Sequence, residues 1–467
     1  VESPIHSRIR MEGSHVGGRS LGGTERSWCK AVPGGTGIAT LGILASSELS
    51  PEFISRLENA LKKLQNSHPV LKSRLRFNPS FSFVENDKPY LEVKVVCLSS
   101  TLEIIESISH HGDDLTEFQR LFEHELNVNS WADSEEEDVV FATIYELPAS
   151  KKLVTLRLHV SACDRTTAST LLMTLRELMA SAETETLGTG TGTEMETLNL
   201  AIEDLVPTGA TRKSLWGRGV DVIGYSVDSY RLTNLPFMDT RFPRRTQVVR
   251  LQLSYEQTQK IISGCNARGI KLAGALAGAG LMAARRSKST STGKQRKYGV
   301  VTLTDCRSAL RRPLSNQHFG FYHSAVMNTH TVTGNEKLWE VAERYHTAFA
   351  ASKKSNKHFT DMADLNFLMC KAIDNPSLTP SSSQRTSLMS LFEDTVVDNS
   401  GDANRTVGVE DYMGCASVHG IGPTIGFFDT VRDGCLDCIC VYPSPLHSRD
   451  QIVEFVGDMK RILELES

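Results

Sequence analysis

Strand-like and helix-like patterns follow one another along the whole of this 467-residue chain. The clearest junction begins at Leu153–Val160, where apolar and polar residues alternate as they do in a half-buried strand. Directly afterwards, at residues 171–179, apolar side chains recur at helical spacing. Because strand and helix patterns interleave in this way in both halves of the chain, we predict an α/β fold.

The same two patterns divide the rest of the chain. Strands are expected at 91–95, 139–146, 246–253, 297–304, 323–332 and 436–442. Helices are expected at 50–67, 115–125, 255–268, 271–286, 336–352 and from residue 448. We therefore predict two α/β lobes, at residues 20–205 and 206–467, each with a mixed sheet and flanking helices. Low-complexity stretches rich in Thr, Gly or Ser predict exposed loops at 181–197, 285–297 and 375–385.

Charge and composition exclude several classes of function. Fifty-one Lys and Arg residues against 55 Asp and Glu leave a net charge of −4, too small a field to hold nucleic acid or a membrane surface. The longest apolar stretches, such as Leu272–Ala284, fall short of the roughly 20 residues that span a bilayer. The ten cysteines are scattered, and no secretory leader is recognised, so a reducing cytoplasm is expected.

One cysteine group and one histidine region invite a functional interpretation. Cys435, Cys438 and Cys440 are close in sequence, but no second ligand pair has zinc-like spacing, so a row of buried thiols is favoured over a metal site.

The segment from Leu158 to Arg165 lies where a strand ends and a helix begins, and it contains His159 and Asp164. From the residues alone, a partly buried histidine beside a capping aspartate is as good an interpretation as an active site.

The segment at 158–165 resembles the HHxxxDG signature of the CoA-dependent acyltransferase superfamily, which includes BAHD acyltransferases, condensation domains and alcohol acetyltransferases. Three further segments resemble that superfamily in the expected order, at 57–75, 269–286 and 300–320. Two more, at 22–37 and 441–451, are similar to plant condensation-domain-containing proteins. The resemblance implies a chloramphenicol-acetyltransferase-like fold with a tunnel between two similar lobes. It also implies that Asp164 is mainly structural and pairs with Arg307.

The match is incomplete at the catalytic position. In the superfamily, the second histidine of the motif removes the proton from the acceptor, but this chain has Val160 there and Arg165 in place of the motif glycine. A valine cannot accept a proton. Either His159 is the base through a shifted register, or another group is, or the site no longer performs ordinary acyl transfer. Because neighbouring strand residues point to opposite faces, His159 would need a bulge to face the tunnel.

A second candidate lies at residues 414–423, a glycine-rich segment that contains Ser417 and His419. His419 can replace the missing base, and Ser417 can donate to the oxyanion of the reaction. An ordinary turn between strands explains the same residues equally well.

Taken with the resemblance, these residues predict an acyltransferase that moves an acyl group from a CoA-type thioester to a small alcohol or amine. His159, Asp164 and His419 are the expected catalytic residues, and Ser417, Arg307 and Arg165 the expected substrate-binding ones. Acyl-CoA is the expected co-substrate, with no permanent cofactor or metal. A cytoplasmic monomer of specialised metabolism is expected, without nucleic-acid or membrane partners. Two alternatives stay open: a binding protein without turnover, or a site repurposed for elimination or cyclisation.

Overall fold

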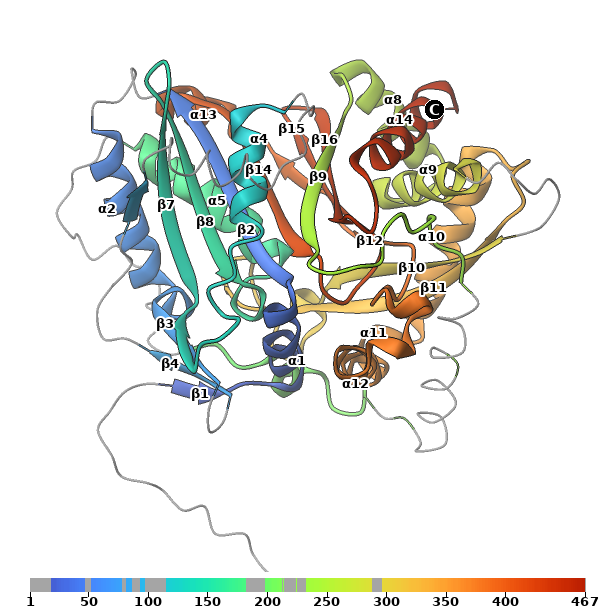
Figure 1. Cartoon of the computed structure of the whole chain (residues 1–467), viewed down its shortest axis with the longest axis horizontal. Coiled ribbons are helices and arrows are strands. Elements are labelled where there is room, and N and C mark those ends of the chain that lie inside the picture. Colours follow the sequence, from blue (N-terminus) through green and yellow to red (C-terminus); the bar gives the residue numbers. More distant parts are fainter. Residues whose placement is uncertain are drawn as a thin grey trace, which may run out of the picture.

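The structure is a computed structural model that describes residues 18–46, 52–77, 81–85, 93–96, 115–181, 198–211, 213, 224, 232–287 and 296–466. Within these ranges the chain forms three sheets with helices packed against them (Figure 1). The expected loop at 182–197 and the middle of the one at 285–297 lie outside the described residues.

The first large sheet contains strands from both ends of the chain. Its order is β14-β2-β8-β7-β5, with strands at β2 (Thr36–Ser46), β5 (Val93–Val96), β7 (Val140–Leu147), β8 (Lys151–His159) and β14 (Val409–Val418). A small neighbouring sheet contains β1 (Gly18–Ser20), β3 (Ser73–Arg76), β4 (Ser82–Glu85) and β6 (Glu136–Asp138). β14 runs antiparallel beside β2, from Val409 opposite Ala45 to Val418 opposite Thr36 (Figure 1). The first sheet is therefore completed by a strand that begins 373 positions after the start of β2.

The second large sheet is built from the second half of the chain. Its order is β11-β10-β12-β15-β16-β9, and β13 pairs with β15. The strands are β9 (Arg245–Gln252), β10 (Arg296–Asp305), β11 (His323–Val332), β12 (Met389–Phe392), β13 (Val396–Asp398), β15 (Ile425–Arg432) and β16 (Cys435–Ser444). The pairs β10–β12, β12–β15 and β13–β15 are parallel. The pairs β10–β11, β15–β16 and β16–β9 are antiparallel, so the sheet is mixed as expected.

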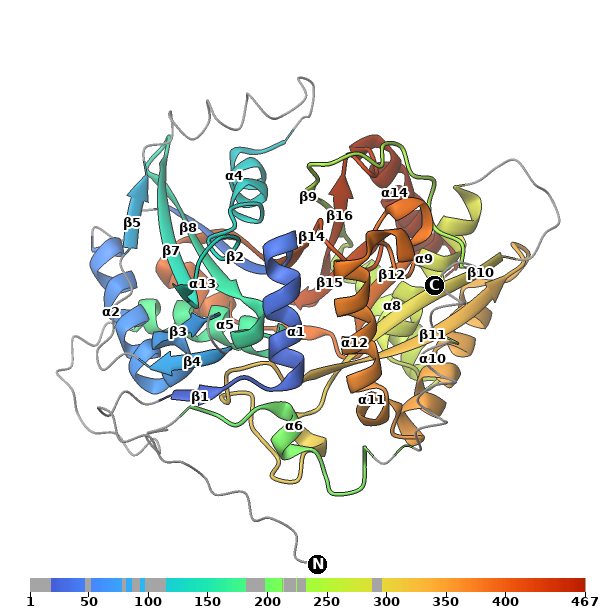
Figure 2. The same ribbon diagram turned by 60° about the horizontal axis from the view of Figure 1, so that its bottom comes forward.

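Helices cover these sheets. They are α1 (Gly23–Ala31), α2 (Phe53–Ser67), α4 (Glu117–Glu125), α5 (Arg165–Ala180), α6 (Ile202–Leu205), α8 (Tyr255–Ala267), α9 (Leu272–Arg286), α10 (Leu338–Lys354), α11 (Lys357–Thr360), α12 (Met362–Asp374), α13 (Gly401–Val407) and α14 (Arg449–Glu466). α9 contacts α8, α10 and α14, and its small residues permit close packing, because a Cβ at Gly278 would lie 3.2 Å from the backbone of α10. α1 lies beside α12, so helices from the two ends of the chain also meet (Figure 2).

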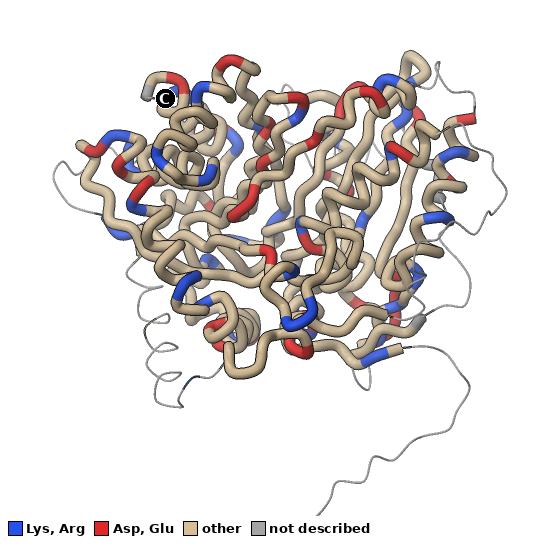
Figure 3. The backbone as a smooth tube through the Cα atoms, turned by 180° about the vertical axis from the view of Figure 1, so that it is seen from behind, with Lys and Arg blue, Asp and Glu red and all other residues tan. Residues whose placement is uncertain are grey.

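Charged residues of both signs are mixed along the fold. Figure 3 shows Lys and Arg interspersed with Asp and Glu in both halves, without one dominant sign. No helix in the described ranges is long and apolar enough to cross a membrane.

Candidate functional site

A cavity of about 410 Å³ lies between the two large sheets and is lined by side chains from both halves of the chain. Most of its wall is apolar. Residues that contribute apolar side chains include Trp28, Leu41, Val160, Leu172, Met173, Leu303, Phe321, Met369, Phe392 and Phe428. Its polar residues include Asp164, Arg165, His323 and Ser417. A large, mostly apolar cavity with a few convergent polar groups is typical of a small-molecule site.

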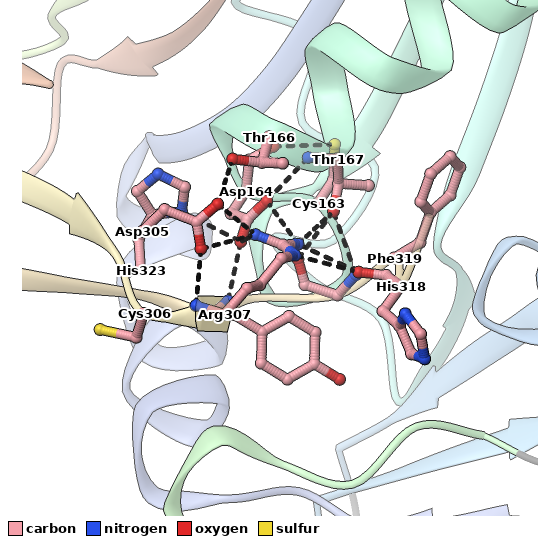
Figure 4. A network of polar contacts seen from close by, with 12 residues as sticks. Cys163, Asp164, Thr166, Thr167, Asp305, Cys306, Arg307, His318, Phe319 and His323 are labelled. Carbon is pink, nitrogen blue, oxygen red and sulfur yellow. Dashed lines mark hydrogen bonds and ion pairs between the residues drawn. The ribbon is translucent and has the colours of Figure 1, made fainter. Parts of the chain in front are cut away.

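Asp164 lines the cavity and forms the expected buried ion pair with Arg307 (Figure 4). Arg307, expected to bind substrate, is not among the described residues that line the cavity. Arg307 donates from Nη1 to Asp164 Oδ2 at 2.9 Å and from Nη2 to Oδ1 at 3.1 Å. The carboxylate also accepts hydrogen bonds from the backbone N–H groups of Thr167 and Tyr322, both at 2.8 Å. Burial alone would raise the pKa of Asp164, but Arg307 in the first place, and His323 beside it, hold that pKa well below its usual range.

Val160, which the resemblance aligned with the catalytic histidine of the motif, lines the cavity. β8 ends at His159, and Val160 begins a short 3₁₀ turn and belongs to an apolar cluster that includes Phe321. Gly37 lies directly against it, with φ at +98°, and a Cβ there would be 2.6 Å from Val160 Cγ1. Val160 is therefore closely packed on the side of β2 and partly open to the cavity.

His159 lies on the other face of β8. Its ring is fully buried, 5.3 Å from the Trp131 ring, and Nδ1 is 2.7 Å from the hydroxyl of Ser161. The β2–β8 register is continuous through Ile38 opposite His159, so no bulge in it turns the ring toward the cavity. Burial lowers the pKa of His159 to about 3, which keeps the ring neutral. Its assignment as the base stays a prediction that this position does not support.

Ser417 and His419 follow one another at the end of β14 but lie in different surroundings. Ser417 lines the cavity, and its Oγ accepts a hydrogen bond from the backbone N–H of Ile38 at 2.9 Å. His419 Nδ1 is 3.0 Å from the Thr246 hydroxyl, and its ring occupies the space where a Cβ at Gly35 would be. Burial and the nearby Arg385 lower the pKa of His419 to about 4. In the described part of the chain, the residues that line the cavity include neither His419 nor His159.

Arg165 reaches from the start of α5 to the second sheet. Its guanidinium donates to the backbone carbonyl of Asp429 and lies over the rings of Phe392 and Phe428, at 5.1 and 5.4 Å from their centroids. Its Nε is buried and has no hydrogen-bond partner within the described ranges. Burial lowers the pKa of Arg165. Arg165 thus places a cation in the cavity wall, where it bridges the two halves.

His323 was not identified from the sequence. It is the first residue of β11, it lines the cavity, and its Nδ1 is 3.0 Å from Asp164 Oδ2. Ala325 and Met327 also line the cavity, so the alternating residues of β11 present one face to it. Alternation in the sequence groups these three residues on one face, but it does not indicate that this face meets the cavity.

The structure gives no support for a metal centre. Among the described residues, no group of three or more His, Cys, Asp or Glu side chains could hold a metal ion. Cys438 and Cys440 are buried in the core of the second half, and both belong to β16. That position fits the row of buried thiols that the sequence favoured.

Comparison with known proteins identifies the fold. The structure resembles the trichothecene 15-O-acetyltransferase TRI3 of Fusarium sporotrichioides, with a TM-score of 0.70, 10% identity, and coverage of 96% of this chain and 95% of that one. It also resembles the EpoB cyclization-docking bidomain of Sorangium cellulosum, with a TM-score of 0.65, 14% identity, and coverage of 96% and 85%. F. sporotrichioides TRI101, solved with coenzyme A and T-2, gives a TM-score of 0.58, 12% identity, and coverage of 94% and 97%.

The fold is the chloramphenicol-acetyltransferase-like one. It is shared by acetyltransferases and by domains of peptide synthetases, as these neighbours show. No family model matches the sequence, and no curated protein matches it either. The likeness is therefore one of structure, and the residues that line the cavity determine which chemistry is possible.

Proposed function

We propose that this protein transfers an acyl group from a CoA-type thioester to a small alcohol or amine bound in the central cavity. The observation that carries the proposal is a cavity lined by both halves, whose wall includes Asp164, a carboxylate held by a buried ion pair with Arg307. Maintaining this pair costs the desolvation of two charges, so it is better explained by an ordered site than by a simple apolar core. The fold is also that of acetyltransferases, one of which was solved with coenzyme A.

The cavity indicates what kind of substrate would fit. Its volume of about 410 Å³ and its mainly apolar wall suit an acyl chain or an acceptor with an extended apolar surface. Ser417 can donate a hydrogen bond to the oxyanion of the tetrahedral intermediate. Its Oγ accepts a hydrogen bond from the Ile38 N–H, so the hydroxyl hydrogen can point to a ligand. Arg165 lines the cavity and can place its positive charge near the acyl carbonyl or an acceptor oxygen. Acyl-CoA would then be a co-substrate of a cytoplasmic monomer with no permanent cofactor.

The test is a panel of acetyl-, hexanoyl- and decanoyl-CoA offered with 1-octanol, geraniol and octylamine. We expect release of the free CoA thiol that depends on the acceptor, with the ester or amide identified by mass spectrometry. Leu172→Arg, which would place a charge in the apolar wall, should lower turnover with the longer substrates most. Thiol release that does not depend on any acceptor would contradict transfer and indicate a hydrolase.

The second candidate function is binding without turnover. The observation that favours it is Val160, which leaves the usual catalytic position without a proton acceptor. A protein of this kind would raise its melting temperature with acyl-CoA but release no thiol with any acceptor.

A further inference from the structure

Of the histidines in the described part of the chain, His323 is the one that lines the cavity. It lies at the end of β11 where that strand meets the Asp164–Arg307 pair (Figure 4). Its side chain is 5% exposed, and it packs edge-on against Phe392, with the ring centroids 5.8 Å apart. The ring is therefore held in place by its neighbours and is open only on its cavity side.

Asp164 fixes which nitrogen of His323 can react. Nδ1 is 3.0 Å from Asp164 Oδ2, a close but bent contact, since Nδ1 has no well-aligned hydrogen-bond partner. Oδ2 itself is immobilised by Arg307 Nη1 and by the backbone N–H of Tyr322. A carboxylate beside Nδ1 favours the tautomer with hydrogen on Nδ1 and leaves the lone pair on Nε2. Bent contacts of this kind are common in empty active sites and tighten when substrate binds.

The geometry points to His323 as the general base of the proposed acyl transfer, acting through Nε2. This inference rests on the proposed function and assigns the proton acceptor that the altered motif lacks. Asp164 then acts as a positioning residue, because its carboxylate orients the imidazole and stabilises the imidazolium that forms.

The proposed step balances in protons and bonds. Nε2 removes the proton from the acceptor hydroxyl or amine while that oxygen or nitrogen attacks the thioester carbonyl carbon. The tetrahedral intermediate collapses with cleavage of the C–S bond, and Nε2–H returns the proton to the leaving thiolate. The products are an ester or amide and a free thiol, and His323 is again neutral.

The experiment measures transfer from decanoyl-CoA to 1-octanol by wild type and by His323→Gln, His159→Gln and His419→Gln. His323→Gln should lower kcat by about 10²- to 10⁴-fold with little change in KM for decanoyl-CoA. His330→Gln, at the other end of β11 and packed on Tyr345, is the matched control and should keep the wild-type rate. Melting temperatures separate lost chemistry from lost folding. A full rate in His323→Gln, or the large loss in His159→Gln or His419→Gln instead, overturns the assignment.

A second measurement keeps the inference separate from the proposed function. Diethyl pyrocarbonate acylates accessible neutral imidazole nitrogens, and the modified peptides are read by mass spectrometry. In the folded wild type, His323 should be labelled much faster than the fully buried His159, and decanoyl-CoA should protect it. If wild type shows no transfer, the proposed function fails, but labelling still tests whether His323 presents a reactive nitrogen. Labelling of His323 no faster than His159 overturns the inference whatever the transfer assay shows.

Discussion

His159, the last residue of β8, and Val160, the first residue of the 3₁₀ turn that follows, lie in different surroundings. His159 points toward Trp131 and is fully enclosed, whereas Val160 points toward the cavity. One step along the chain therefore separates a packed imidazole from a side chain of the cavity wall. Valine at residue 160 offers the cavity no proton acceptor.

Residue 160 should accept a histidine. Val160→His should shift the melting temperature by only a few degrees, because its side chain borders open volume and an imidazole can extend there. Leu158→His is the matched control on the same strand, since Leu158 is fully buried in the core of the first half. An unpartnered polar group there should cost about 1–3 kcal/mol in addition to lost packing. Thermal melts of both variants test this, and equal losses would show that Val160 is ordinary core.

His159 should make stability depend on pH. The unfolded chain protonates its histidines below about pH 6.5, whereas burial holds the pKa of His159 in the folded protein at about 3. The unfolded state therefore binds more protons in this window, and the stability contributed by a neutral His159 is lost as pH falls from about 6.5 toward 3. Chemical denaturation at several pH values should show a shallower slope in His159→Gln, by up to about 1.4 kcal/mol per pH unit. Identical slopes would contradict the burial of His159.

At the scale of elements, Asp164 connects a helix, a strand and a turn. Its Oδ1 caps α5 through the N–H of Thr167, while Arg307 reaches it from the 3₁₀ turn after β10. The same carboxylate contacts His323 at the start of β11. One side chain thus fixes where elements of the two halves meet at the cavity.

Removing this connection should be costly. Asp164→Asn should lower the free energy of unfolding by about 3–5 kcal/mol, because Arg307 is left as an uncompensated buried charge. Asp305→Asn is the control, since Asp305 also contacts Arg307 at 3.2 Å but its side chain is 23% exposed, and it should cost about 1 kcal/mol or less. Denaturant titration measures both. The double variant Asp164→Asn, Arg307→Met should lose less than the sum of the single changes, and strict additivity would contradict the coupling.

Local patterns predicted most elements but not their partners. The apolar stripe of α2, the alternation in β8 and the small residues of α9 depend on neighbours in sequence, so periodicity identifies them. Pairing is different: nothing in the pattern of 409–418 indicates that it joins β2. The pairing of Asp164 with Arg307 was predicted through a resemblance, whereas His323 was missed, because no short motif shows which face of a strand borders a cavity.

At the scale of the whole molecule, the two predicted lobes share a strand. β14 belongs by sequence to the second half and by hydrogen bonding to the first sheet. The boundary at residues 205 and 206 stays a prediction, but the halves on either side of it are joined by this pairing and by the contact of α1 with α12.

This arrangement predicts that neither half folds stably alone. A fragment of residues 18–205 would expose the edge of β2, which is largely buried in the whole protein and pairs with β14 from Thr36 to Ala45. Long apolar edges of this kind aggregate. A fragment of residues 206–467 would in turn carry β14 without its neighbour. We therefore expect each fragment to be insoluble or to melt without a cooperative transition, and the two expressed together to form a soluble complex with one cooperative melt. A fragment of residues 18–205 that melts cooperatively by itself would show that the shared strand is dispensable.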